Sequence, residues 1–441
     1  MLCALVSGLL TLVAADGQDW PGFLGPNRDG TTSEVVDAWG AGGPKVRWEV
    51  ERGESYASPV VVGDLVVFTH RVGNESHVDA LDLESGARRW RHSFPTKYRG
   101  EYIENSGPRA TPVVVDGVVY VHGIEGELMA LSLENGEVIW ERHLTRELGV
   151  PDSFFGVVSS PLVLGDRLIQ NVGAADGPSV IALDRATGET VWGAGDEWGA
   201  RCASPVAATI HGRERVLVVT GGKTRPPTGG LMVIDPADGA VDFSYPFRSK
   251  TYTSVNGTSP LAIGDAVFLS ASYGTGSVLL DLDAEGGFTE RWKKRRFGLQ
   301  FGNPIALAGG LVCVEGSAGR VGSITRLSLE TGDVAWRADI DEKVAFAVGD
   351  TTREMDLSVG EGSLTVLGDG RVLCLGDTGL LVLLEIDEGG ARVLARHADW
   401  FAQDSWTPPV VARGAILLAQ NSVCRFTQKP ARLIAYDARA D

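Results

Sequence analysis

The feature that most limits the fold of this chain is a unit of about 50 residues that recurs eight times. Each copy begins with a small residue and a proline, continues as an apolar run and turns at a Gly-Asp or Asp-Gly pair. A strand of the form Ala-Leu-Asp follows, then a glycine and, four residues later, a tryptophan, as in Gly188 and Trp192. In the seventh copy residues 357–359 replace the opening pair. The prolines that open the other copies are Pro59, Pro112, Pro161, Pro205, Pro260, Pro304 and Pro408.

Each unit is predicted to consist of about four short strands. Period-two apolar runs such as residues 65–68 favour strands over helices. A four-stranded sheet of this size cannot bury its own faces, so repeated copies must pack against one another in a ring. We therefore predict an all-β fold, an eight-bladed β-propeller of four-stranded blades.

The two ends of the chain indicate how the ring closes. The eighth unit stops after its Ala-Tyr-Asp strand at residues 435–437 and has no tryptophan strand. A tryptophan strand without a preceding unit occurs instead near the start, at residues 45–50 around Trp48. The N-terminal strand is therefore predicted to complete the last blade.

Composition and the N-terminus bound the class of protein. The net charge of −17 argues against nucleic acid, whose binding rests on a positive surface. Residues 2–15 form a short apolar run that ends in Val13-Ala14-Ala15, which is typical of a cleaved signal peptide, although no basic residue precedes it. We expect a signal peptide over 1–15, an N-terminal extension over 16–44 and the propeller over 45–441. The expected location is the periplasm, the cell envelope or the exterior.

Residues 182–192 resemble the tryptophan-docking motif of the PQQ quinoprotein dehydrogenases, which is also present in non-enzymatic relatives such as the outer-membrane assembly lipoprotein. The resemblance covers roughly residues 45–441. It implies that each motif tryptophan stacks between blades against the motif glycine of a neighbour. Residues 19–30 resemble the opening segment of many secreted propellers of this kind, a type common in planctomycete-like bacteria. The tryptophans at matching positions are Trp48, Trp90, Trp140, Trp192 and Trp336.

The sequence contains no recognisable catalytic, cofactor-binding or metal-binding constellation. The histidines show no HExxH spacing, and no GxSxG elbow is present. A dehydrogenase of the resembled family would need carboxylate and amide ligands for Ca²⁺ and often carries adjacent cysteines. Adjacent cysteines are absent from this sequence, and Glu104-Asn105 and Gln403-Asp404 are its best candidate oxygen-ligand pairs.

Long, irregular connections between one unit and the next predict a binding face. Such stretches occur at 92–109, 141–158, 244–257, 337–357 and 396–406, and in a propeller all of them emerge on one face. Those residues that closely precede an inner strand are expected to line the channel mouth; the alternative is that they fill the channel and bond one another. The candidate partner-binding residues are Tyr102, Arg109, Phe154, Arg201, Asn256, Arg353 and Trp406.

Two functions of different classes follow from these observations. The leading hypothesis is an exported, non-catalytic and monomeric scaffold without a cofactor or a transmembrane segment, which binds an envelope protein or a glycan on the long-loop face. The alternative is a dehydrogenase of an alcohol or sugar that depends on PQQ and calcium. The repeat itself is specific for the fold and does not distinguish the two.

Overall fold

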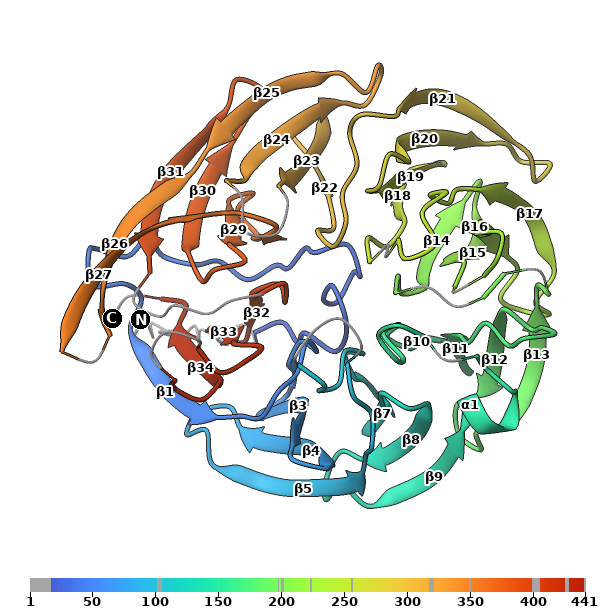
Figure 1. The fold of residues 1–441 in the computed structure, drawn as a ribbon, viewed down its shortest axis with the longest axis horizontal. Helices are drawn as coiled ribbons and strands as arrows, with labels where there is room; N and C mark the ends of the chain where they lie inside the picture. The colour runs from blue at the N-terminus through green and yellow to red at the C-terminus, as the bar shows by residue number, and fades with distance from the viewer. Residues whose placement is uncertain are drawn as a thin grey trace, which may run out of the picture.

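The computed structural model describes residues 17–100, 105–151, 153–196, 198–199, 202–222, 224–254, 257–316, 321–348, 350–398, 405–424 and 428–439. The described chain forms a ring of eight four-stranded antiparallel sheets around a central axis, which confirms the predicted eight-bladed β-propeller (Figure 1). One short helix, α1 (Leu144–Glu147), is present among these residues.

The first four blades follow one another along the chain, each with its innermost strand first. Blade 1 comprises β2 (Val60–Val62), β3 (Leu65–Val72), β4 (Glu75–Asp82) and β5 (Arg88–Pro95). Blade 2 comprises β6 (Val113–Val115), β7 (Val118–His122), β8 (Glu127–Ser132) and β9 (Val138–His143). Blade 3 comprises β10 (Leu162–Leu164), β11 (Arg167–Asn171), β12 (Val180–Asp184) and β13 (Thr190–Ala194). Blade 4 comprises β14 (Val206–Ile210), β15 (Arg213–Thr220), β16 (Gly230–Ile234) and β17 (Val241–Pro246).

The remaining blades continue the ring and return to the N-terminus. Blade 5 comprises β18 (Leu261–Ile263), β19 (Ala266–Ala271), β20 (Gly276–Leu282) and β21 (Phe288–Lys294). Blade 6 comprises β22 (Ile305–Leu307), β23 (Gly310–Glu315), β24 (Ser323–Ser328) and β25 (Val334–Asp339). Blade 7 comprises β28 (Ser363–Val366), β29 (Val372–Leu375), β30 (Leu381–Ile386) and β31 (Ala391–His397). Blade 8 comprises β32 (Val410–Ala412), β33 (Ala415–Ala419), β34 (Arg432–Asp437) and, from the other end of the chain, β1 (Val46–Glu51).

The ring closes through β1, as the sequence predicted. This strand pairs antiparallel with β34, with Trp48 opposite Ala435 and Val50 opposite Leu433. Because β1 is the outermost strand of blade 8, the first and last structured parts of the ring share one sheet (Figure 1). The closure gives blade 8 its fourth strand and leaves no blade without neighbours.

Five tryptophans lock successive blades together in one geometry. The ring of Trp140 in blade 2, for example, packs against Gly188 of blade 3, where a Cβ atom would lie 2.8 Å from the ring. The indole N–H of Trp140 donates a hydrogen bond to the carbonyl of Arg185 in the same turn, at 3.0 Å. The matching pairs are Trp48 with Gly86, Trp90 with Gly136, Trp192 with Gly239 and Trp292 with Gly332.

Two tryptophans, Trp292 and Trp336, differ from the sequence-based expectation. Trp292 docks although its turn is longer than the motif and it was not among the expected docking residues. Trp336 is half-buried against the core between blades 6 and 7, and its indole N–H has no hydrogen-bond partner among the described residues. The reason lies in the next blade, where Asp387 and Gly390 form a shorter turn that offers no equivalent glycine.

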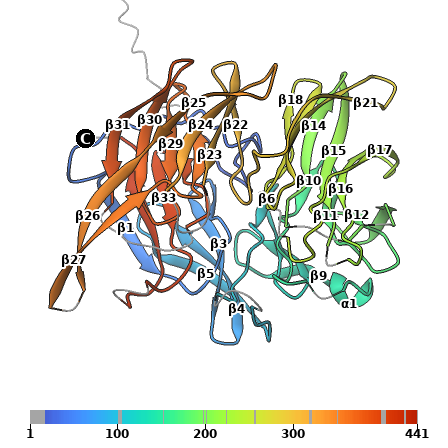
Figure 2. The same ribbon diagram turned by 45° about the horizontal axis from the view of Figure 1, so that its top comes forward.

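The long connection between blades 6 and 7 was expected to be irregular, and that expectation was wrong. It forms a two-stranded hairpin of β26 (Asp341–Val348) and β27 (Thr351–Ser358), which extends beyond the rim of the ring (Figure 2). Residues 357–359 therefore end this hairpin and do not open blade 7, whose inner strand is β28. The two strands pair in register over eight residue pairs, so backbone hydrogen bonds hold this segment as a two-stranded ribbon.

The small residue before each proline has a structural role that its sequence pattern did not reveal. The backbone N–H of Thr111 in blade 2 donates to the hydroxyl of Ser160 in blade 3, at 2.9 Å. Ser160 donates in the same way to Ser204, at 3.0 Å, and the series runs from blade 1 to blade 6. Proline follows each of these residues without disrupting the series, because the small residue itself supplies both the donor and the acceptor.

Replacing Ser160 by Ala is expected to lower the free energy of unfolding by about 1–3 kcal/mol, because the buried N–H of Thr111 loses its acceptor. Ser159→Ala is the matched control, since Ser159 is equally buried and its hydroxyl has no partner among the described residues. Denaturant unfolding of the two variants measures the difference. Equal losses of stability would contradict a role for the blade-to-blade series.

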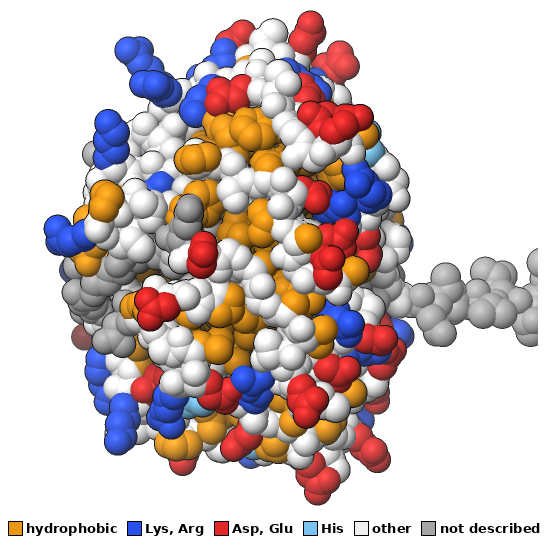
Figure 3. Space-filling view, turned by 90° about the vertical axis from the view of Figure 1, so that its right-hand side faces the viewer, with side chains coloured by type: hydrophobic (Ala, Val, Ile, Leu, Met, Phe, Trp, Pro, Cys, Tyr) orange, Lys and Arg blue, Asp and Glu red, His pale blue; other side chains and the backbone are white. Residues whose placement is uncertain are grey.

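The hydrophobic core lies between the blades and is divided into clusters, one at each interface. One cluster joins β7, β8, β11 and β12 across blades 2 and 3, and another joins blades 7 and 8. The outer strands also leave apolar side chains at the rim, among them Val191 and Val241, and Figure 3 shows hydrophobic side chains between charged ones on this side of the ring. Burial in every interface makes each blade depend on both neighbours.

Candidate binding site

A cavity of about 460 Å³ lies at the centre of the face that carries the long connections. The connections from each outer strand to the next inner strand all emerge on this face, together with the turns between second and third strands. The opposite face carries the tight turns between the first and second strands and between the third and fourth strands, such as those at residues 63–64 and 83–87. The cavity therefore opens where loop sequence varies most between blades.

Three aromatic rings are stacked along one side of the cavity. The ring of Trp406 lies between those of Tyr56 and Phe301, with centroid distances of 5.3 and 4.5 Å and interplanar angles of 15° and 24°. The guanidinium of Arg109 continues the series, 5.3 Å from the centroid of Tyr56 and 5.4 Å from that of Tyr98. These residues come from connections into blades 1, 2, 6 and 8, so only the closed ring brings them together.

Arg109 is held by its own loop. Its guanidinium donates to the carbonyls of Gly107 and Asn105, at 2.8 and 3.0 Å, and burial lowers its pKa from the usual value. Asn105 is itself buried and donates to the carbonyl of Asn421 in blade 8. Arg109 thus holds the loop before blade 2 in place, and its guanidinium packs against the ring of Tyr56.

Further aromatic rings line the opposite side. Phe154 packs edge to face with Tyr252 at a centroid distance of 5.6 Å, and its carbonyl accepts a hydrogen bond from the hydroxyl of Tyr98. The guanidinium of Arg225 lies 3.9 Å from the centroid of Tyr252. Phe154 and Phe155 both line the cavity, so its two long sides are aromatic.

The N-terminal segment closes the channel at the other end. Trp20 pairs with Val61 of blade 1, and the carbonyl of Pro21 accepts from Val114 of blade 2. The segment then crosses to blade 7, where Thr31 pairs with Val366 (Figure 1). The described part of the predicted extension over 16–44 thus begins across the inner strands, and its later residues run outward, where Trp39 donates to the carbonyl of Arg396 on the outer strand of blade 7.

Phe23 lies on the part of this segment that crosses the axis, and its side chain lines the cavity. The floor otherwise consists of the small polar residues that open the inner strands, such as Ser58 and Thr111. The cavity thus has aromatic side chains along its sides and small polar residues between them, and Phe23 contributes a further ring.

Two polar groups at the cavity have no internal partner. The indole N–H of Trp406 and the hydroxyl of Ser58 are buried and make no hydrogen bond to any described residue. Both residues line the cavity. Buried donors are normally satisfied, so these two groups are suited to a ligand that supplies hydrogen-bond acceptors.

The structure brings together three of the seven candidate partner-binding residues. Arg109, Phe154 and Trp406 all line the cavity. Arg353 lies on β27, exposed on the hairpin and not among the residues that line the cavity. The other candidates, Tyr102, Arg201 and Asn256, lie outside the described residues, as do Glu104, Gln403 and Asp404.

Sequence reasoning missed Tyr56, Phe301 and Phe23. The first two occupy the same place in the repeat, two residues before the small residue that opens an inner strand. The same position supplies Arg109, Val158 and Cys202 to the cavity, and a search by repeat position would have found them all. Nothing in the sequence around Phe23 indicates that it crosses the axis.

The described residues that line the cavity do not fit a calcium-bound quinone. No aspartate or glutamate is among the described residues that line the cavity, whereas Ca²⁺ prefers carboxylate and carbonyl oxygens. The one lining arginine, Arg109, already uses its guanidinium on main-chain carbonyls. The part of the chain that the structure describes also contains no group of three or more His, Cys, Asp or Glu side chains arranged to hold a metal ion.

The closed ring of tryptophan-docked blades defines a PQQ-like β-propeller. The family model described as outer membrane protein assembly factor BamB matches residues 30–146, 74–338 and 320–439. The chain belongs to this family. Among the described residues no helix has the length and apolarity to cross a membrane.

Individual relatives agree with this assignment. The chain is 30% identical to outer membrane protein assembly factor BamB of Salmonella typhimurium over 135 residues, which are 30% of this chain and 31% of that protein. The match thus spans about a third of the length of this curated relative.

Two solved structures share the fold. The crystal structure of BamB from Moraxella catarrhalis superposes with a TM-score of 0.55 at 14% identity, over 90% of this chain and 99% of that chain. A quinohemoprotein alcohol dehydrogenase from Comamonas testosteroni gives a TM-score of 0.61 at 13% identity, over 96% and 81%. These identities show the fold alone, and the propeller is common to binding proteins and enzymes.

Proposed function

We propose that the chain is an exported, non-catalytic and monomeric scaffold of the cell envelope that binds a protein partner on its long-loop face. The observation that carries the proposal is the aromatic cavity at the centre of that face. Relatives named as outer membrane protein assembly factors support an envelope protein as the partner. Export rests on the signal peptide expected at residues 1–15, which lie outside the described residues.

The chemistry of the cavity indicates what the partner inserts. Stacked rings of Tyr56, Trp406 and Phe301 offer flat apolar surface to an aromatic or aliphatic side chain. The unpartnered indole N–H of Trp406 is suited to a main-chain carbonyl of the same segment. A protein loop that presents an apolar side chain beside an exposed carbonyl satisfies both requirements, so a loop tip is the proposed occupant.

Trp406→Ala is expected to reduce partner capture about 10- to 100-fold, because aromatic anchors in central pockets dominate interface energies. The measurement is quantitative mass spectrometry of proteins that crosslink to the purified propeller in a native envelope extract. Glu134→Ala is the control, since Glu134 is exposed on a tight turn of the opposite face. Thermal unfolding checks that each variant retains the closed ring.

Two results would count against the proposal. Equal capture by the Trp406→Ala and Glu134→Ala variants would remove the cavity from the interface. Saturable binding of an envelope glycan at Trp406, with no protein captured, would replace the protein partner by a carbohydrate.

A further inference from the structure

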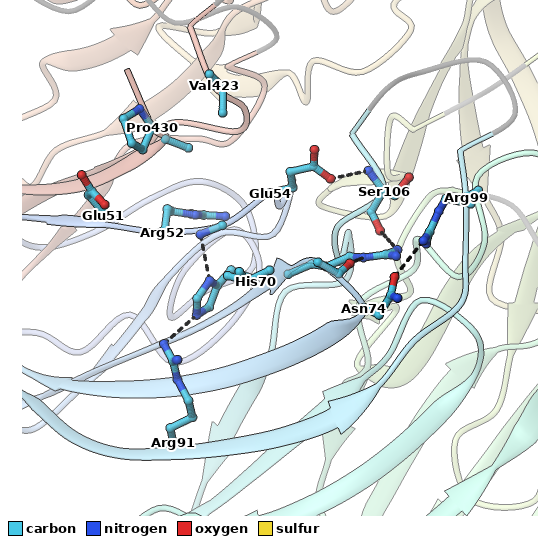
Figure 4. Close-up of a pocket in the computed structure, with 15 residues that line it drawn as sticks. Glu51, Arg52, Glu54, His70, Asn74, Arg91, Arg99, Ser106, Val423 and Pro430 are labelled. Carbon is cyan, nitrogen blue, oxygen red and sulfur yellow. Dashed lines mark hydrogen bonds between the residues drawn. The ribbon is translucent and has the colours of Figure 1, made fainter. Parts of the chain in front are cut away.

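A second cavity, of about 670 Å³, lies between blades 8 and 1 on the long-loop face and is separate from the central one (Figure 4). Its lining comes from the end of β1, from β3 and β5, and from the connection that precedes β34. Figure 4 shows Arg52 beside His70, with Pro430 and Val423 of blade 8 on its other side. The cavity therefore sits where the N-terminal strand closes the ring.

Arg52 is a buried cation without a hydrogen-bond partner in the described part of the chain. Its side chain is 4% exposed, and none of its three guanidinium nitrogens hydrogen-bonds to a described residue. The nearest aromatic contact is the ring of Phe68, 5.7 Å from the guanidinium carbon. Burial lowers the pKa of Arg52 to about 9, so the group is still a cation at neutral pH. A buried charge with no counter-charge costs several kcal/mol, so an external anion would relieve it.

The neighbouring groups do not neutralise Arg52. His70 accepts a hydrogen bond from the backbone N–H of Gly53 through Nδ1, at 2.8 Å, and its Nε2 faces Asp79 at 3.2 Å. That arrangement fits the neutral imidazole, and burial lowers the pKa of His70 further. The carboxylate of Asp79 is held by Arg91 through two contacts of 2.6 Å. The carboxylate of Asp79 is therefore already occupied by His70 and Arg91.

Two further arginines of the lining, Arg71 and Arg99, are bonded to neutral groups. The guanidinium of Arg71 donates to the carbonyls of Gly73, Tyr98 and Ser106, and that of Arg99 donates to main-chain carbonyls and to the Asn74 amide oxygen. These are neutral acceptors, so both charges persist.

The charges of the lining leave room for one anion. Four arginines line the cavity, against the two carboxylates of Glu51 and Glu54. Behind this lining, Asp79 and Glu75 act on Arg91, and Glu125 acts on Arg71. Among the residues that line the cavity, positive charges therefore outnumber negative ones. A single carboxylate on a small organic molecule matches this excess of positive charge. A molecule with two negative charges would be repelled by Glu51 and Glu54, which line the same cavity.

We propose that this cavity binds a small organic molecule through one carboxylate group, which pairs with the guanidinium of Arg52. The planar fork of an arginine bonds both oxygens of a carboxylate, and the bond is strong where water is excluded. The volume accommodates a molecule well beyond acetate in size. This site is independent of the partner cavity and of the proposed scaffold function.

Thermal unfolding in sodium acetate tests the proposal, with sodium chloride of equal ionic strength as the reference. The expected result is a saturable rise in Tm of roughly 1–3 °C with acetate, absent with chloride and smaller with inorganic phosphate. Arg52→Met should abolish the rise and, without acetate, should leave Tm unchanged or higher, because an unpaired buried charge is removed. Arg291→Met, which removes an arginine paired with Asp281 in blade 5, should keep the acetate response.

A crystal of the wild-type protein soaked with 4-bromobenzoate, whose aryl bromide does not alkylate side chains, provides a test that does not depend on folding of a variant. Anomalous scattering should place bromine in the cavity beside Arg52. Bromine only at other sites, an acetate response retained by Arg52→Met, or a phosphate response as large as that of acetate would overturn the proposal.

Discussion

Replacing Trp48 by Ala is expected to lower the free energy of unfolding by about 3–5 kcal/mol. The ring of Trp48 is 8% exposed and packs against Gly86 of blade 1, while its indole N–H donates to the carbonyl of Leu83 at 2.8 Å. Its strand, β1, is at the same time the outer strand of blade 8. The substitution therefore loosens the closing blade and its junction with the first blade together.

Trp336→Ala is the matched control for this prediction. Trp336 occupies the same repeat position, yet it has no glycine to pack on and its indole N–H has no partner among the described residues. We expect a loss of about 1–2 kcal/mol there, because a half-buried side chain has less packing to lose. Guanidinium unfolding followed by tryptophan fluorescence and by circular dichroism measures both variants. Equal losses of unfolding free energy in Trp48→Ala and Trp336→Ala would show that packing on a glycine adds no stability.

Replacing Trp20 by Ala is expected to have a comparable effect, about 3–5 kcal/mol, although Trp20 lies outside the repeats. Its side chain is 0% exposed and packs with Val61 of blade 1 and Val410 of blade 8. Gly25 lies against the same ring, where a Cβ atom would be 3.0 Å away. Removing the indole would leave a void beneath the inner strands and release the segment that carries Phe23.

The control for Trp20 is Trp39→Ala in the same segment. Trp39 is half-buried, and its indole N–H bonds the carbonyl of Arg396 at the outer strand of blade 7. A loss of about 1 kcal/mol is expected for Trp39. Binding of a hydrophobic dye should rise in Trp20→Ala, because loosening Phe23 opens the central cavity. Unchanged stability and dye binding in Trp20→Ala would contradict the idea that the segment with Phe23 covers the central cavity.

The sequence placed some of the residues that line the central cavity and missed others, while partner binding by any of them stays a prediction. The loops between blades predicted Arg109, Phe154 and Trp406, and the structure places all three at one cavity. Tyr56 and Phe301, the two rings that stack on Trp406, were missed because they lie in short connections. Loop length indicates which face carries the long connections. The position of a residue within the repeat decides whether its side chain reaches the central cavity.

The sequence by itself determined the blades and their closure. A local pattern of strand, turn and glycine-to-tryptophan spacing repeats around Gly188 and Trp192, and local hydrogen bonding and burial are enough to convert it into a blade. The unpaired strand around Trp48 similarly specified the seam, because blade 8 lacked an outer strand.

Only the tertiary structure decided which groups meet between blades. Phe23 lines the central cavity because its segment crosses the axis from blade 2 toward blade 7, and the guanidinium of Arg52 meets no hydrogen-bond partner among the described residues where blade 8 packs on blade 1. Both facts depend on residues far apart in the chain. The repeat pattern specifies contacts within a blade and with the next blade. It therefore contains no information on the position of Phe23 or on the partners of Arg52.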